Sequence, residues 1–354
     1  MENFIMGAIS DQWLPFSRII VKSDGNNWSF SWDAKELKKI YKLLRIPVVS
    51  SRYENIIKYQ SVFYTSRYDV LANWKKPHHR IAFPYYHGQP STSLMFKSIY
   101  DSFCIHHGEI NRVQVTNSMM EDLILSSGID SHKVFRIPIG INLDYFNLTT
   151  DRLREKSRSW LGIPQTAFVI GSFQKDGVGM KEGLDPKQIK GPDIFLKTIK
   201  ILKDQIPEIF VLLTGPARGY VKNGLENLGV PYLHRYLNDY TDIGRYYNAL
   251  DLYLISSREE GGPKAVLESM ASGIPLVTTR VGQAMDLVKH GENGWMVEPE
   301  DTEGLAYWVK YVLDNGSSIN KVLKEGQVTA TNNSYTKQIH LWKDFMNGFV
   351  DSDP

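Results

Sequence analysis

The chain has a single cysteine, Cys104, among its 354 residues. An internal disulfide is therefore impossible, and this composition fits a reducing compartment. No run approaches the roughly 18–20 consecutive apolar residues that a membrane-spanning helix needs. Residues 1–14 lack both a basic segment and a long apolar core, so no signal peptide is expected. These absences predict a cytoplasmic protein, and they leave attachment to a membrane surface open.

The chain also lacks a strong excess of either charge. Its 41 lysines and arginines stand against 39 aspartates and glutamates, a net charge of +2 that is too small to predict a nucleic-acid partner. Hydrophobic residues make up 42% of the chain, which is typical of a globular protein. Because 354 residues exceed one ordinary domain, we expect two.

Short apolar segments alternate with helical patterns along the whole chain. In the first part we expect strands at residues 3–6, 18–22, 47–50, 62–65, 80–84, 112–116 and 134–138. In the second part we expect strands at residues 168–173, 210–214, 231–234, 252–255, 274–278 and 295–297. Helices are expected between the latter at residues 192–204, 221–228, 242–249, 263–272 and 302–313. This alternation predicts an α/β protein whose second part is a Rossmann-like domain with a parallel sheet.

Two carboxylates bracket an expected helix start in residues 256–282. An apolar strand leads into a loop that ends in Gly261, Gly262 and Pro263, where a helix is expected to begin. Glu260 precedes this start, and Glu268 lies within the helix. Because the first N–H groups of a helix favour phosphate, the segment suits a sugar, a diphosphate and a ribose in that order. The plainer alternative for Glu268 is a surface ion pair with Lys264 one turn back.

The residues Glu260-Gly261-Gly262-Pro263, followed by the sequence ESMASGIP at 268–275, resemble the retaining nucleotide-sugar glycosyltransferases of family 4, the group 1 glycosyl transferases. The resemblance implies the GT-B fold, in which two Rossmann-like domains face each other across a cleft. It implies an acceptor-side domain at 1–150, a nucleotide-sugar-binding domain at 151–334, and a C-terminal helix in 335–354 that packs back on the first domain. It also implies a metal-independent hexosyltransferase that retains the anomeric configuration, with a nucleotide-diphosphate sugar as substrate and no cofactor.

The resemblance places phosphate-binding basic residues in the long loop 172–191. Lys190, before Gly191, matches one such position. Lys175 is the nearest basic residue to a second position, where family members often carry Gly-Arg. Lysine neutralises phosphate as a point charge. The alternative for both is a solvated surface lysine, and the length of the loop suggests a lid.

Further candidate residues lie at other strand ends, where ligands of α/β sheets gather. His87 follows the strand at 80–84 and is the candidate for a cleft-facing histidine that orients sugar or acceptor, with a structural histidine as the alternative. Arg218 is a candidate for contact with phosphate or base, or else a surface arginine. The resemblance places the nucleobase at the backbone of Tyr236 and Leu237. Gly282 is expected to let the backbone approach the donor.

No metal site is expected. The adjacent histidine pairs 78–79 and 106–107 have no cysteine partners and no wider ligand spacing. An amphipathic helix at residues 33–46 carries a basic face formed by Lys35, Lys38, Lys39, Lys42 and Arg45. That face is either an ordinary solvated surface or a peripheral membrane contact.

Three functions remain open from the sequence. The first is a glycosyltransferase of glycan or glycolipid assembly, acting on a sugar, polysaccharide or lipid-linked acceptor. The second is a catalytically silent subunit that binds nucleotide sugar, and the third is a nucleotide-sugar epimerase of related fold. A double-glycine loop that many family members carry is missing near Gly7, which favours the second alternative slightly.

Overall fold

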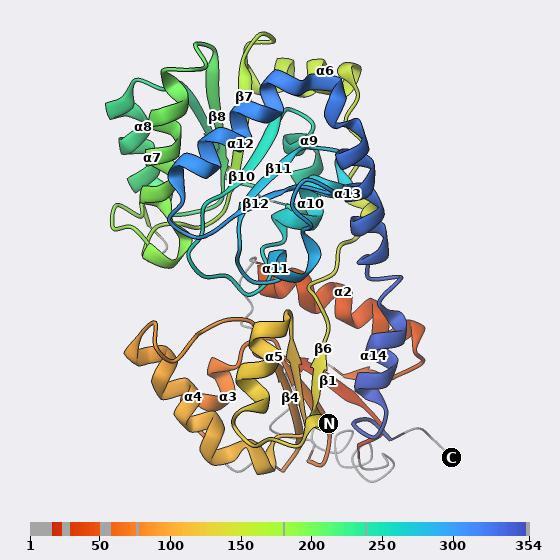
Figure 1. The fold of residues 1–354 in the computed structure, drawn as a ribbon. Coiled ribbons are helices and arrows are strands. Elements are labelled where there is room, and N and C mark those ends of the chain that lie inside the picture. Colours follow the sequence, from red (N-terminus) through yellow and green to blue (C-terminus); the bar gives the residue numbers. More distant parts are fainter. Residues whose placement is uncertain are drawn as a thin grey trace, which may run out of the picture. The chain divides into compact units, whose positions relative to one another are not determined.

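The computed structural model describes residues 16–22, 29–49, 58–75, 78–179, 181–237 and 239–351. The chain forms two compact units, one of residues 1–138 together with 335–354 and one of residues 139–334 (Figure 1). In the described ranges, each helix is too short or too polar to cross a lipid bilayer. The expected strand at 3–6 and the segment around Gly7 lie outside the described residues.

The first unit is built on a parallel sheet whose described strands follow the order β2-β1-β3-β4-β5-β6. Their bounds are β1 Ile19–Lys22, β2 Val48–Val49, β3 Ser61–Tyr64, β4 Arg80–Pro84, β5 Arg112–Val115 and β6 Val134–Arg136. The helices of this unit are α2 Ser29–Leu43, α3 Tyr68–Leu71, α4 Leu94–His106, α5 Ser118–Leu125 and α14 Ile339–Met346. Every expected strand within the described ranges is therefore present.

Side chains of successive strand residues enter two different cores, because they point to opposite faces of the sheet. Ile19 and Val21 pack with residues of α2 and α14, including the fully buried Trp342. Ile20 lies on the other face with residues of α3, α4 and α5. The C-terminal helix α14 thus completes the first unit, although the whole second unit, residues 139–334, precedes it in the sequence.

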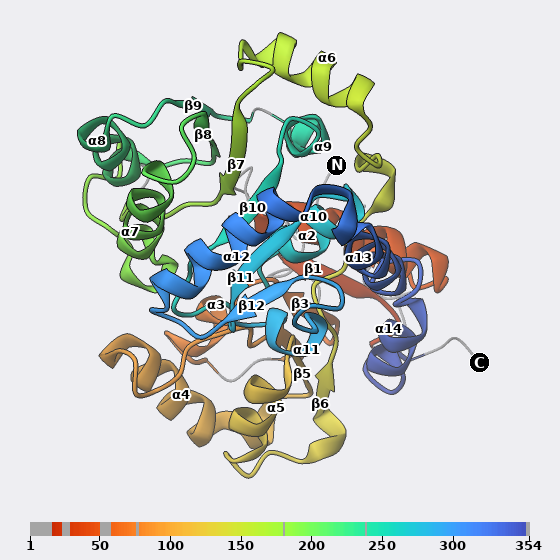
Figure 2. The same ribbon diagram turned by 45° about the horizontal axis from the view of Figure 1, so that its top comes forward.

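The second unit also has a parallel sheet, with the strand order β12-β11-β10-β7-β8-β9 among the described strands. Their bounds are β7 Phe168–Phe173, β8 Ile209–Thr214, β9 Tyr232–Arg235, β10 Leu252–Ile255, β11 Leu276–Thr279 and β12 Trp295–Val297. The helices are α6 Asp151–Leu161, α7 Pro192–Lys203, α8 Gly219–Leu228, α9 Ile243–Tyr247, α10 Ala265–Ala271, α11 Ala284–Leu287, α12 Thr302–Asn315 and α13 Asn320–Asn332. Helices α7, α8 and α12 pack on one core of this sheet, and α9, α10 and α13 pack on the other (Figure 2). Two Rossmann-like units, each with a parallel sheet, are confirmed.

The segment that follows β6 is folded. Ile141 and Phe146 are buried in a core of the second unit, so residues 139–150 group with that unit and not with residues 1–138. Helix α6 follows at once, since the Thr150 hydroxyl accepts from the Leu153 N–H and Gly162 ends the helix with a φ of 72°. Both caps can be read from the sequence.

Candidate functional site

Lys190 and Glu260 form an ion pair in the second unit. Lys190 ends a short 3₁₀ turn before α7, and Glu260 lies in the loop between β10 and α10. The Lys190 Nζ lies 2.5 Å from one carboxylate oxygen of Glu260, and the Ser257 hydroxyl donates to the other at 2.9 Å. The structure therefore brings together two of the predicted site residues that are 70 positions apart in the sequence.

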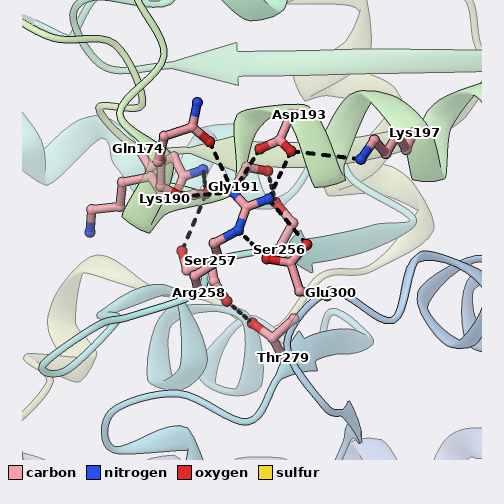
Figure 3. Close-up of polar contacts among 11 residues, drawn as sticks. Gln174, Lys190, Gly191, Asp193, Lys197, Ser256, Ser257, Arg258, Thr279 and Glu300 are labelled. Atoms are coloured by element: carbon pink, nitrogen blue, oxygen red, sulfur yellow. Dashed lines mark hydrogen bonds and ion pairs between the residues drawn. The ribbon is translucent and has the colours of Figure 1, made fainter. Parts of the chain in front are cut away.

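Close backbone packing fixes Lys190 beside this loop. Gly191 has a φ of 58°, and a Cβ there would lie 1.9 Å from the carbonyl oxygen of Ser256. Only glycine allows this approach. The Ser256 hydroxyl in turn donates to the Gly191 carbonyl at 2.9 Å, and both residues are drawn in Figure 3. Gly191 is thus needed for the position of Lys190.

Arg258, in the loop after β10, also holds this loop against the start of α7 (Figure 3). Its guanidinium donates to both carboxylate oxygens of Asp193 at 2.7 Å and also pairs with Glu300. The hydrogen bonds from Arg258 hold the pKa of Asp193 below its usual range. The backbone N–H of Arg258 donates to the Ile189 carbonyl at 2.9 Å. Sequence reasoning missed this residue, because a partner 65 positions away leaves no local pattern.

Glu268 is a buried carboxylate, with only 5% of its surface exposed. The Tyr247 hydroxyl donates to one oxygen at 2.8 Å, and the Tyr240 hydroxyl donates to the other. The two tyrosine hydroxyls orient this carboxylate, and an ionised carboxylate can accept about four hydrogen bonds. The alternative that Glu268 is a surface residue is wrong, because its side chain is buried.

Lys187 lies within electrostatic reach of Lys190, Lys175 and Glu260. Burial lowers the pKa of Lys187, the nearby charges of Lys190 and Lys175 lower it further, and Glu260 opposes them. Lys187 was not predicted, although it stands three residues before Lys190, a spacing that places side chains on the same side of a 3₁₀ turn. The cluster supplies positive charge suited to an anion.

Helix α10 begins two residues later than expected and holds seven residues, Ala265–Ala271. Among the described side chains, none caps its N-terminus. So short a helix has a weak dipole, and we assign the positive charge of the site to the lysines instead. Gly262 is packed tightly against Ile139, because a Cβ there would lie 2.8 Å from the Ile139 Cδ1.

Two predicted site residues, Arg218 and Gly282, are packed against other parts of the chain. Arg218 is 1% exposed, pairs with Asp176 at 3.0 Å, and donates to the carbonyls of Ser172, Gln174 and Thr214. This burial contradicts its predicted contact with the nucleotide, since its guanidinium is committed to the chain itself. Gly282 has a φ of 50°, and a Cβ there would lie 2.5 Å from the Gly261 carbonyl oxygen. Gly282 therefore lies close to the loop that carries Glu260 and Gly261.

The remaining predicted residues lie on two different units. Tyr236 and Leu237 follow β9 in the second unit, with Tyr236 exposed and Leu237 half-buried. His87 follows β4 in the first unit, where its ring meets that of Phe96 edge-on at 5.4 Å. In the part of the chain that the structure describes, no three His, Cys, Asp or Glu side chains are grouped so as to hold a metal ion.

Comparison with known proteins shows a family match over much of the second unit. Residues 181–328 match the family model described as glycosyl transferases group 1. The D-inositol 3-phosphate glycosyltransferase of Corynebacterium urealyticum is 30% identical over 208 residues, which cover 55% of this chain and 46% of that protein. The chain thus spans about half the length of the curated relatives it matches.

Solved structures share the fold over most of the chain. Anabaena HepE in complex with UDP and glucose superposes with a TM-score of 0.74 at 15% identity, covering 94% of this chain and 99% of that one. Sucrose-phosphate synthase from Thermosynechococcus elongatus has a TM-score of 0.66 at 17% identity, covering 89% and 78%.

Proposed function

Because the chain belongs to the group 1 glycosyl transferases, we propose that it transfers a sugar from a uridine diphosphate sugar to an acceptor hydroxyl, with retention of the anomeric configuration. The Lys190–Glu260 ion pair carries this proposal, since it places a cation and a hydroxyl acceptor side by side. UDP is proposed as the nucleotide because the fold neighbour from Anabaena was solved with it.

Different residues bind different parts of the donor. Negative charge collects on the diphosphate as the glycosidic bond breaks, and Lys190, Lys187 and Lys175 stabilise it electrostatically. The ammonium of Lys190 has three donors and can serve Glu260 and a phosphate oxygen together. Glu260 accepts hydrogen bonds from hydroxyls of the transferred sugar, and Glu268 accepts them from the ribose.

The remaining candidate residues bind the other parts of the donor and the acceptor. The loop Gly261-Gly262-Pro263-Lys264 lies along the diphosphate, and the backbone of Tyr236 and Leu237 holds the nucleobase. His87 orients the sugar or the acceptor. We further propose front-face attack, assisted by the departing phosphate and without a metal, in glycan or glycolipid assembly.

Donor screening followed by product analysis tests the function. Thermal unfolding with UDP-, ADP- and GDP-sugars should show stabilisation by a UDP-sugar. UDP release with acceptor glycosylation supports the transferase, and retained binding without turnover would favour the silent subunit. Conversion of the sugar without any acceptor would favour the epimerase. The variant Glu260→Ala should slow UDP release more than it weakens donor binding.

The charge state of Lys187 should control UDP binding at alkaline pH. Burial and the neighbouring lysines lower its pKa, so it loses its proton at a lower pH than an ordinary lysine. A neutral amine no longer stabilises phosphate, and UDP affinity should therefore fall as the pH rises through this lowered pKa. Calorimetric titration of UDP from pH 7 upward measures the fall.

The matched variant for this prediction is Lys187→Arg. Its guanidinium stays protonated at these pH values, so the fall in affinity should move to higher pH. An identical pH profile in the variant would show that Lys187 does not contact the phosphates.

We also propose that the basic face of α2 contacts anionic lipid. Lys35, Lys39 and Lys42 are exposed, while Leu37, Ile40 and Tyr41 are buried in the core of the first unit. Each basic residue near an anionic surface gains about 1 kcal/mol. Co-sedimentation with vesicles should therefore rise with their content of anionic lipid and fall in a Lys35→Glu/Lys39→Glu/Lys42→Glu variant. Equal pelleting with neutral vesicles would contradict this contact.

A further inference from the structure

Arg67 is a buried arginine in the first unit, at the carboxyl end of β3. Its relative exposure is 4%. The guanidinium carbon lies 4.3 Å from the ring centre of Tyr85 and 4.8 Å from that of Tyr68. Among the described residues, no carboxylate lies within ion-pair distance of it. Every other nearly buried arginine in the described ranges, Arg158 and Arg218, pairs with an aspartate.

Hydrogen bonding around Arg67 is incomplete within the described residues. Its Nη2 donates to the Tyr68 hydroxyl at 3.1 Å, while its buried Nε makes no hydrogen bond. The buried hydroxyls of Tyr85 and of Thr65, two residues before Arg67, also make none. Burial raises the pKa of Tyr85 to about 12, so this phenol stays a donor at neutral pH. Unsatisfied buried polar groups are rare in folded proteins and often mark the place of a ligand.

The aromatic contacts alone do not account for this arrangement. A cation–π contact stabilises a cation by less than the cost of burying a charge without a charged partner. A guanidinium also presents its donors in a planar fork that matches phosphate or carboxylate. The missing partner therefore has the character of an anion.

His87 belongs to the same cluster. The ring of Phe96 meets His87 at 5.4 Å, and the Arg67 guanidinium lies 5.9 Å from the centre of the same ring. Gly88 has a φ of 110°, and a Cβ there would lie 2.6 Å from the Arg67 Nη2. The loop after β4 is thus fitted around the guanidinium. Arg67 and His87 follow adjacent parallel strands, at the sheet edge where ligands of α/β proteins bind.

We propose that Arg67 binds an anionic group, a phosphate or a carboxylate, carried by the acceptor substrate. The hydroxyl of Tyr85 and the imidazole of His87 provide further hydrogen-bonding groups around that anion. The proposal rests on the proposed function only in assigning the anion to the acceptor, because the binding site itself lies wholly within the first unit.

Inorganic phosphate is the probe, and the full chain is titrated in the presence of saturating UDP. UDP fills the lysine cluster of the second unit, so the phosphate binding that persists reports on the first unit. We expect calorimetry to detect this binding and the NMR signals of His87 to shift with it. Acetate in place of phosphate tests whether a carboxylate is preferred.

The variant Arg67→Met should weaken this phosphate binding at least tenfold. Its matched control is Arg80→Met, because Arg80 also lies over an aromatic ring, Phe16 at 4.2 Å, but pairs with Asp351 at 2.7 Å. Phosphate affinity should be unchanged in the control. Wild-type phosphate affinity in Arg67→Met would overturn the proposal, as would undetectable phosphate binding by the UDP-saturated wild-type protein.

Two further measurements distinguish a loss of anion binding from a loss of folding, and anion binding from donor binding. Arg67→Lys keeps the charge and the stem but loses the fork, so it should bind phosphate several-fold more weakly with little change in its unfolding temperature. Wild-type phosphate affinity in Arg67→Lys would contradict the role of the planar guanidinium in binding the anion. If the chain does not bind UDP, the proposed function fails, and the same titrations in a Lys190→Met background still decide whether Arg67 binds the anion.

Discussion

Replacing Lys190 by methionine is expected to lower kcat by about 100- to 1,000-fold, the usual effect of removing one preorganised group that stabilises charge in a transition state. Lys190 is fixed by the Gly191 turn against the Ser256 carbonyl, so it needs little rearrangement to meet the diphosphate. Methionine keeps most of the apolar stem and removes the ammonium. Steady-state release of UDP from a UDP-sugar measures the effect.

The matched control for this variant is Lys197→Met. Lys197 lies on α7 near the same network, pairs loosely with Asp193 at 3.9 Å, and has a side chain that is 64% exposed (Figure 3). The two variants lose the same charge, and the control should keep kcat within about twofold, since exposed ion pairs contribute little. Equal rates in both variants would contradict the role of Lys190.

Replacing Glu268 by alanine is expected to weaken UDP binding by about 10- to 100-fold. Hydrogen bonds to a charged partner contribute about 1.5–3 kcal/mol, and Glu268 is held ready by the hydroxyls of Tyr240 and Tyr247. Isothermal titration with UDP measures the loss. Because the change also leaves the buried Tyr247 hydroxyl without its acceptor, the variant should unfold at a lower temperature as well.

A ligand that lacks the ribose hydroxyls separates these two effects. With 2′,3′-dideoxyuridine diphosphate, the wild-type protein and Glu268→Ala should bind almost equally, because the contact is absent in both. Glu268→Gln serves as the structural control, since its amide oxygen can still accept from a tyrosine hydroxyl. A loss of affinity in Glu268→Ala that is equally large for the dideoxy ligand would contradict the contact with ribose.

The strands could be predicted because their signal is local. Strands β4, β7, β10 and β12 have the expected bounds, since each is a short apolar run between polar segments. Several helices, among them α6 and α13, were not predicted. Helix α6 was not predicted, because its charged sequence carries few apolar residues, and only the caps at Thr150 and Gly162 mark it. The motif from Glu260 to Glu268 was also readable, because its residues are close in the sequence.

The sequence by itself determined two α/β units, a family, and one segment with two acidic residues. The tertiary structure alone decided which cations belong to which site. Lys187 and Lys190 lie beside Glu260, Arg218 is enclosed by its own chain, and Arg67 is buried without an acidic partner among the described residues. The physical reason is that burial and ion pairing depend on residues tens of positions apart that meet only when the strands are in register. A lysine or an arginine has the same local signature whether it is solvated, structural or part of a site.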